Sequence, residues 1–170
     1  AIYALGLLQT LKLLGIETHL VMTKMGENVV KYECGLDKND LMEFAKEIYS
    51  YDDLYAPIAS GTFKTEGMVI IPCSMKTLAA VANGYSDNLL SRSADVVLKE
   101  RRKLVVVPRE TPLSIIHLKN MLELSRAGAV IMPAAPGFYT HPQCISDIVA
   151  IMTGKILDAL DDGHESLGLI

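Results

Sequence analysis

The sequence predicts one doubly wound α/β domain built on a mostly parallel sheet. Residues 68–71 (MVII), 103–107 (KLVVV) and 129–132 (AVIM) are short and almost continuously apolar, which is typical of strands buried on both faces. Segments with apolar residues at helical spacing separate these runs, so strands and helices alternate along the chain. At 170 residues, half of them hydrophobic, the chain has the length of a single domain with a substantial core.

The first element is an amphipathic helix over residues 1–14, because Ile2, Leu5 and Leu8 recur at helical spacing and Gly15 follows. A helix that packs on a parallel sheet normally follows a strand, so we expect a first strand and its connecting turn to precede Ala1. The next elements are a strand over residues 18–22, a weaker helix over residues 26–34, and a helix that Asn39 or Asp40 caps and that runs through Ile48.

Residues 67–92 form the central stretch of the chain. Pro72 lacks an amide hydrogen, so we expect it to end the strand at residues 68–71. Ser74 then stands where a helix N-cap is expected, before the apolar residues of a helix. Free backbone N–H groups after such a cap bind anions. Both an ordinary capped helix and a phosphate-binding turn fit this local pattern.

The remaining elements follow from the same signals. Residues 49–66 are rich in Tyr, Asp, Pro, Ser and Gly and predict a loop with one short edge strand. Asp87 is expected to cap a helix over residues 88–100, and Thr111 and Pro112 to start a helix that Gly128 closes. A Pro- and Gly-rich loop over residues 133–142 and a long helix over residues 145–160 complete the chain.

Composition narrows the function. A net charge of −4 argues against general nucleic-acid binding, and no apolar run reaches the roughly 20 residues of a membrane span. Cys34, Cys73 and Cys144 are odd in number and widely spaced, which favours a reducing cytoplasm over a disulfide framework or structural zinc. The His residues are equally scattered, so we expect no protein-bound metal and a small-molecule partner.

Three strands end in proline-bearing turns, IIPCSMKT, VVVPRETP and VIMPAAPGFYTHP. Ligands of such sheets collect beyond the carboxyl ends of the strands, so the chemistry is expected at these turns. Arg109 offers a planar fork of donors for a phosphate or a flavin carbonyl, and Glu110 could position it or carry a proton. The alternative is a helix start with Glu110 favoured by the helix dipole and Arg109 in solvent.

Other candidate residues have weaker signals. Arg92 and Lys99 are seven residues apart on one predicted helix, so their spacing permits both to reach one anion. Arg101 and Arg102 are interpreted as solvated cations at a helix end. Tyr139 lies in a loop, either as a ligand contact or as an ordinary loop tyrosine. Two further residues are assigned no chemistry from the pattern: His141 is interpreted as structural and Lys155 as a surface lysine.

The chain resembles the flavin prenyltransferases of the UbiX/Pad family, formerly called aromatic-acid decarboxylases. The similarity covers nearly the whole chain, in family order and spacing, in the segments AIYALGLLQTLK, ETHLVMTK, ASGTFKTEGMVIIPCSMKTLA, GYSDNLLSRSADVVLKERRKLVVVPRETPL and GAVIMPAAPGFYTHPQ. The resemblance implies one Rossmann-like, FMN-binding flavoprotein domain. It also implies transfer of the dimethylallyl group of dimethylallyl phosphate to reduced FMN, first at N5 and then at C6. The product, prenylated FMN, is the cofactor of a partner UbiD-type decarboxylase, in ubiquinone biosynthesis or in aromatic-acid decarboxylation.

The resemblance also implies the site. It assigns flavin binding to Thr23, Ser74, Met75, Lys76, Thr77 and Arg109. It assigns the prenyl phosphate to Arg92, Lys99, Glu110, Tyr139 and Lys155. Glu33 is expected near the reacting flavin as a candidate for proton transfer, with Lys99 and Glu110 as the other catalytic candidates. No divalent metal is required, because fixed cations can stabilise the departing phosphate.

Two departures from the family pattern stand out. Lys155 replaces an arginine of some relatives, which exchanges a planar fork for a point charge. The second departure is that the given residues do not include the Gly-rich turn with its flavin-contacting serine or threonine, which we expect before Ala1. The family habit also implies a large homo-oligomer, a dodecamer, whose neighbouring subunits complete each site.

Two alternative functions remain at this point. An FMN-dependent decarboxylase of the cysteine type has a similar turn, but it reads PASANT where this chain reads PCSMKT, and its PxMNxxMW motif has no counterpart here. A non-catalytic flavin-binding subunit that stores or delivers FMN is the other alternative.

Overall fold

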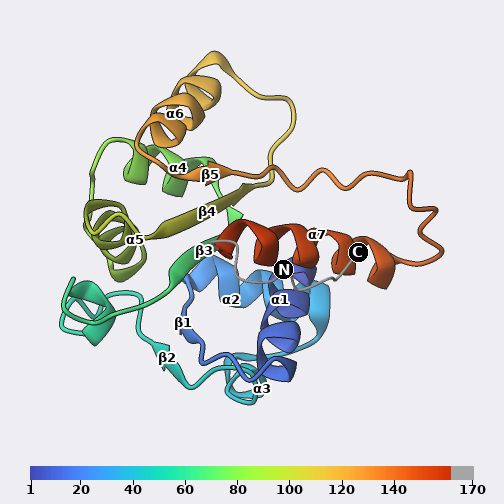
Figure 1. Cartoon of the computed structure of the whole chain (residues 1–170). Coiled ribbons are helices and arrows are strands. Elements are labelled where there is room, and N and C mark those ends of the chain that lie inside the picture. Colours follow the sequence, from blue (N-terminus) through green and yellow to red (C-terminus); the bar gives the residue numbers. More distant parts are fainter. Residues whose placement is uncertain (162–170) are drawn as a thin grey trace.

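The computed structural model describes residues 1–161, and its strands pair in parallel throughout that part of the chain. β1 (His19–Val21) pairs with β2 (Glu47–Tyr49) in one sheet. β3 (Gly67–Cys73), β4 (Lys103–Pro108) and β5 (Val130–Ile131) form a second sheet in that order (Figure 1). The predicted parallel α/β architecture is therefore confirmed.

Helices cover both faces of the β3–β4–β5 sheet and so bury β4 on both sides. Leu104 and Val106 point into a core formed with α4 (Met75–Ala82), α5 (Leu89–Lys99) and α6 (Ile115–Arg126). Val105 and Val107, which alternate with them, point into a second core with α1 (Ile2–Leu13) and α7 (Ile145–Leu160). All four side chains are fully buried. Because successive side chains of a strand point to opposite faces, both faces of β4 are covered. The sheet is doubly wound.

The contact between α1 and α7 depends on Gly6. A Cβ atom on Gly6 would lie 2.3 Å from Cγ1 of Val149, a separation that no packed structure tolerates. The missing side chain lets the two helices approach closely over the Val105 and Val107 face of the sheet.

The helix predicted to run through Ile48 is wrong. α2 (Lys24–Cys34) is followed by α3 (Lys38–Leu41), a single turn capped by Asp37, whose carboxylate accepts hydrogen bonds from the N–H groups of Asn39 and Asp40. Ile48 instead pairs with Leu20 as part of β2. The apolar residues of this segment have helical spacing, but pairing with a parallel partner strand decides its conformation. The short edge strand expected within residues 49–66 is not found there, because β2 ends at Tyr49 and residues 50–66 contain a 3₁₀ turn, η1 (Pro57–Ala59), but no strand.

The strand predicted to end at Pro72 also continues. Cys73 pairs with Pro108 after an irregularity in register between Ile70 and Cys73. The bulge leaves the missing donor of Pro72 outside the regular ladder, so the strand tolerates it.

Two of the predicted helix starts are shifted. Asn88, not Asp87, caps α5, because its Oδ1 accepts from the N–H of Ser91 at 3.0 Å, while Asp87 accepts from the Asn88 side chain. Ser114, not Thr111 or Pro112, caps α6 and accepts from the N–H of His117. The predicted first helix, the Ser74 cap and the last helix are confirmed.

Within residues 1–161, none of the helices combines the length and the apolar composition that a membrane span requires. That part of the chain also brings together no group of three or more His, Cys, Asp or Glu side chains that could hold a metal ion.

Candidate active site

Three predicted site residues follow the carboxyl ends of β1, β3 and β4. Thr23 follows β1 and caps α2, with its hydroxyl accepting from the N–H of Gly26 at 2.9 Å. Ser74 follows β3 and caps α4, and Arg109 follows β4 with its side chain exposed. The three strands run parallel within their sheets, and each of these residues follows a carboxyl end, where the fold places ligands.

The Ser74 turn has the geometry of an anion-binding helix start. The Ser74 hydroxyl accepts from the backbone N–H of Thr77 at 3.2 Å, and its oxygen lies 3.1 Å from the Thr77 hydroxyl. Ser74 and Lys76 are exposed, whereas Met75 is half-buried against the core. The turn therefore combines a fixed backbone with two hydroxyls and one flexible cation at the positive end of the helix dipole.

Glu33 and Arg109 act on each other electrostatically, although they lie far apart in the sequence. The Glu33 carboxylate contacts the backbone nitrogen of Ala1 at the start of α1. That contact, the N–H of Ile2 and the positive charge of Arg109 hold the pKa of Glu33 below its ordinary value, against the opposing effect of partial burial. A lower pKa makes Glu33 a weaker base, so its proposed part in proton transfer rests on the family resemblance and not on this shift. Glu110 is also exposed, and its carboxylate accepts from the N–H of Thr111 at 3.1 Å.

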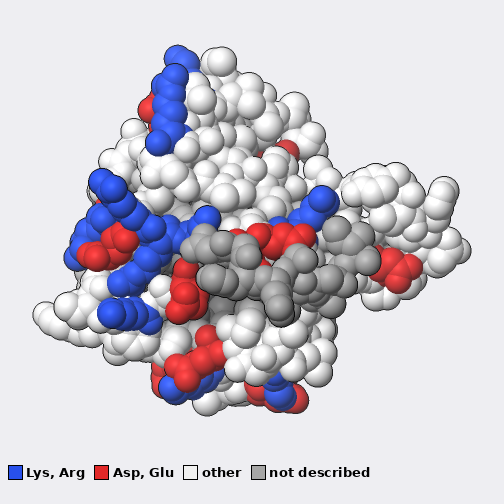
Figure 2. Space-filling view, in the orientation of Figure 1, with Lys and Arg blue, Asp and Glu red and all other residues white. Residues whose placement is uncertain are grey.

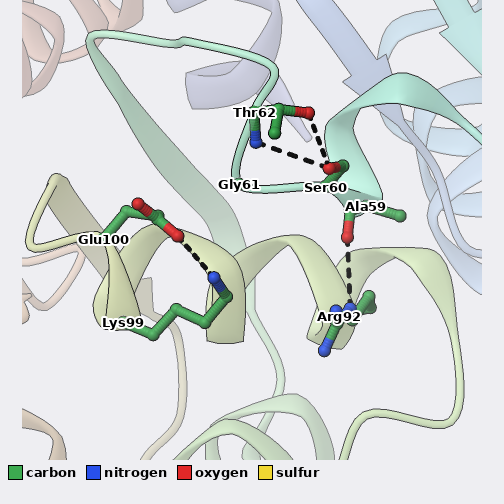
Figure 3. Close-up of a pocket in the computed structure, with 7 residues that line it drawn as sticks. All are labelled: Ala59, Ser60, Gly61, Thr62, Arg92, Lys99 and Glu100. Carbon is green, nitrogen blue, oxygen red and sulfur yellow. Dashed lines mark hydrogen bonds and ion pairs between the residues drawn. The ribbon is translucent and has the colours of Figure 1, made fainter.

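Arg92 and Lys99 line one open pocket of about 510 Å³, which we call the α5 pocket (Figure 3). One wall is α5 with its end at Glu100, and the other is the loop at residues 59–62. Both side chains lie on the pocket side of α5, as their spacing of seven residues permits. Figure 2 shows basic side chains gathered over the region of α5, with acidic side chains among them. The complete lining is Ala59, Ser60, Gly61, Thr62, Arg92, Lys99 and Glu100.

The two cations of the α5 pocket are already engaged. Nε of Arg92 donates to the carbonyl oxygen of Ala59 at 3.2 Å, and its Nη1 lies 3.2 Å from Asp95 Oδ2. Nζ of Lys99 pairs with Glu100. Lys99, and to a smaller extent the charge of Arg102, lower the pKa of Glu100. An anion that enters the pocket therefore competes with Glu100 for Lys99.

Tyr139 and Lys155 are exposed, and neither lines the α5 pocket. Tyr139 lies in the loop after β5, with its ring over Gly137, where an added Cβ would lie 2.6 Å from Cε1 of the ring. Lys155 projects from α7. Within one chain, the predicted residues for the prenyl phosphate are thus spread over several elements.

Sequence reasoning missed the wall formed by Ser60, Gly61 and Thr62, and it was wrong about Arg102. Only Arg101 fits the interpretation of a solvated cation, since it is exposed, whereas Arg102 is half-buried and donates to two backbone carbonyls of this loop. The Ser-Gly-Thr composition was the available signal, but it did not reveal which helix the loop faces.

The comparisons with known proteins decide the family. The model of the flavoprotein family matches residues 1–158. A probable UbiX-like flavin prenyltransferase of Streptomyces sp. (strain D7) is 49% identical over 160 residues, which are 94% of this chain and 80% of the relative. The chain belongs to the UbiX/Pad flavin prenyltransferases.

Solved structures of UbiX/Pad proteins agree with this fold. AnUbiX (PadA1), crystallised with FMN and dimethylallyl pyrophosphate, is 48% identical, with a TM-score of 0.92 over 94% of this chain and 85% of that one. A dodecameric FMN-dependent UbiX-like decarboxylase from Escherichia coli O157:H7 is also 48% identical, with a TM-score of 0.89 over 92% of this chain and 86% of that one. The peptidyl-cysteine decarboxylase EpiD, at 20% identity and a TM-score of 0.59, shares the fold alone.

Proposed function

We propose that this UbiX/Pad chain joins the dimethylallyl group of dimethylallyl phosphate to reduced FMN at N5 and C6 and so makes prenylated FMN. The observation that carries the proposal is the α5 pocket, in which Arg92 and Lys99 of one helix face two hydroxyl-bearing residues, Ser60 and Thr62. Two cations and two hydroxyls are a donor set suited to a phosphate monoester. The crystal structure of the relative with FMN and dimethylallyl pyrophosphate supports the same ligand chemistry.

The flavin is proposed to bind at the carboxyl edges of β1, β3 and β4. Ser74 and Thr77, with the N–H groups of Met75 and Lys76, would hold the FMN phosphate at the start of α4. Thr23 and Arg109 would contact the rest of the flavin, the guanidinium as a planar donor to a ring carbonyl. FMN supplies the nucleophilic nitrogen and carbon, while the chain supplies position and charge.

Bond cleavage in the prenyl donor gives the two cations of the α5 pocket their proposed role. When the allylic C–O bond breaks, its electron pair stays on the phosphate, whose negative charge grows. Arg92 and Lys99, fixed before the reaction, would stabilise that charge, and Glu33 would accept the proton that the flavin loses. Glu110 and Tyr139 are proposed as further contacts to the phosphate, with Lys155 in place of the arginine of some relatives.

We propose that each site is shared between subunits of a homo-oligomer. Lys99 and Glu110 flank β4 at opposite ends, which supports a site that takes the two residues from different chains. A second copy, with its Glu110 edge against the α5 pocket of the first, would close the site. The dodecameric relative from Escherichia coli supports an assembly of this size.

The context of the reaction is also a proposal. A UbiD-type decarboxylase would receive the prenylated FMN. The cytoplasm suits the three free cysteines, because they form no disulfide in the structure. Residues 1–170 are proposed to act as a single flavoprotein domain.

A product assay tests the function. The purified protein is mixed with reduced FMN and dimethylallyl phosphate, and the flavin is analysed by mass spectrometry. The expected product is a flavin heavier by one isoprenyl unit, formed only when both substrates are present. An FMN-loaded protein that leaves the flavin unchanged would contradict the proposed function.

A further inference from the structure

The outer wall of the α5 pocket is a loop with little structure of its own. Residues 59–63 run from the last residue of η1 to the segment before β3, and they lie outside the strands of either sheet. Ser60 and Thr62 contribute hydroxyls to this wall, with their oxygens 2.9 Å apart. A phosphate in the pocket would meet these hydroxyls only if the loop stays at a fixed distance from α5.

Arg102 supplies the contacts that fix this distance. Its Nη1 donates to the carbonyl oxygen of Phe63 at 2.8 Å, and its Nη2 donates to that of Gly61 at 2.7 Å. The backbone N–H of Arg102 donates to the carbonyl oxygen of Val97 at 2.9 Å, which fixes the residue to the last turn of α5. A planar guanidinium thus bridges two carbonyls that are two residues apart, a geometry that an ammonium group does not reproduce.

The loop and Lys99 depend on each other through Gly61. A Cβ atom at Gly61 would lie 2.2 Å from Oε1 of Glu100 and 3.0 Å from Nζ of Lys99. The Lys99–Glu100 pair therefore lies against the backbone of Gly61, whose carbonyl oxygen accepts from Arg102 (Figure 3 shows the pair and Gly61). A displacement of the loop would change the space around Lys99 as well as the positions of the two hydroxyls.

We propose that Arg102 is a positioning residue for the prenyl phosphate. It does not line the pocket itself, and it acts by holding residues 59–63 so that Ser60, Thr62 and Lys99 surround one anion. The inference rests on the proposed function, since the phosphate is that of dimethylallyl phosphate. Arg92, which donates to Ala59, anchors the other end of the loop.

The test compares Arg102→Gln with Arg101→Gln. Each variant removes one positive charge at the same helix end, but the exposed Arg101 is not placed in the site. We expect Arg102→Gln to raise KM for dimethylallyl phosphate by about tenfold, as for the loss of hydrogen bonds from a charged donor, while kcat and the Kd for FMN stay within roughly threefold. Arg102→Lys, which keeps the charge and can reach one carbonyl, should fall between the two.

Amide hydrogen exchange gives a readout that does not depend on turnover. Residues 59–63 should exchange faster in Arg102→Gln than in Arg101→Gln or the wild type, while α4 exchanges equally in all three. Equal exchange in this loop, or an unchanged KM in an active enzyme, would overturn the inference. So would a parallel loss of FMN affinity, kcat and thermal stability, because that pattern indicates a purely structural residue. A wild-type enzyme without product contradicts the proposed function instead, and the exchange rates then still decide whether Arg102 holds the loop.

Discussion

Lys99 and Glu110 lie at opposite ends of β4. Lys99 ends α5 four residues before the strand, and Glu110 follows the last residue of the strand by two. The six residues of β4 span about 20 Å at the usual rise of a strand. This separation supports the proposal that a site using both residues draws them from different copies of the chain.

Mixed oligomers should recover activity that neither parent variant has. Lys99→Ala and Glu110→Ala are each expected to be inactive, but their co-expression in one cell creates sites with an intact Lys99 from one copy and an intact Glu110 from another. Random assembly restores roughly a quarter of the wild-type sites. The measurement is the rate of prenylated FMN formation by oligomers that carry two different affinity tags. Recovery of no activity would place both residues in sites formed by a single chain.

Lys99→Ala should abolish turnover and leave the fold intact. Lys99 is exposed at the end of α5, so its removal leaves no buried cavity, whereas the departing phosphate loses a fixed cation. We expect kcat/KM for dimethylallyl phosphate to fall at least about 100-fold, as for the loss of one oxyanion donor. Lys119→Ala on α6 is the matched control, since Lys119 is exposed and lies outside the α5 pocket. Wild-type activity in Lys99→Ala would remove this residue from the site.

Ser74→Ala and Ser114→Ala separate capping from flavin binding. Both serines accept a hydrogen bond from a backbone N–H three residues later, at 3.2 Å and 3.3 Å. Each substitution should lower the free energy of unfolding by about 1 kcal/mol, the usual contribution of an N-cap. Only Ser74→Ala should also raise the Kd for FMN, by roughly tenfold, because a hydrogen bond to a charged phosphate is lost. Equal FMN affinity in the two variants, measured by flavin fluorescence, would argue against the Ser74 turn as the phosphate site.

Cys73 should make the protein less stable in alkali. Burial raises the pKa of the Cys73 thiol to about 12, above the value of 9.0 for an unperturbed thiol. From about pH 9 upward, the unfolded chain loses this proton while the folded chain keeps it, so the free energy of unfolding falls as pH rises towards 12. One proton contributes at most about 1.4 kcal/mol per pH unit.

The measurement is urea unfolding between pH 8 and about pH 10.5. The wild type should lose stability more steeply than Cys73→Ala over this interval. Cys144→Ala, which alters an exposed cysteine, should keep the slope of the wild type. An identical slope in Cys73→Ala and the wild type would show that this thiol makes no such contribution.

Local signals were sufficient wherever one residue fixes the backbone around it. Ser74 was identified as a helix cap from its own side chain and the apolar residues that follow, and the buried run at residues 103–107 could only be a strand covered on both faces. Local signals predicted the wrong element where a residue distant in the sequence decides the backbone conformation. Ile48 fits a helix by spacing, yet it pairs with Leu20, and Pro72 stays within a strand because a bulge accommodates it.

The amino-acid sequence was enough to predict the parallel α/β architecture, the strand-end turns and, through its motifs, the family. These follow from the order and period of apolar residues and from side chains that act within a few positions of themselves. Two relationships are visible only in the folded chain: Arg102 donates to two carbonyls of the loop at residues 59–63, and β4 lies between Lys99 and Glu110. Arg102 and Gly61 are 41 residues apart in the chain, and their contact exists only because the packing of α5 and the sheet brings them together.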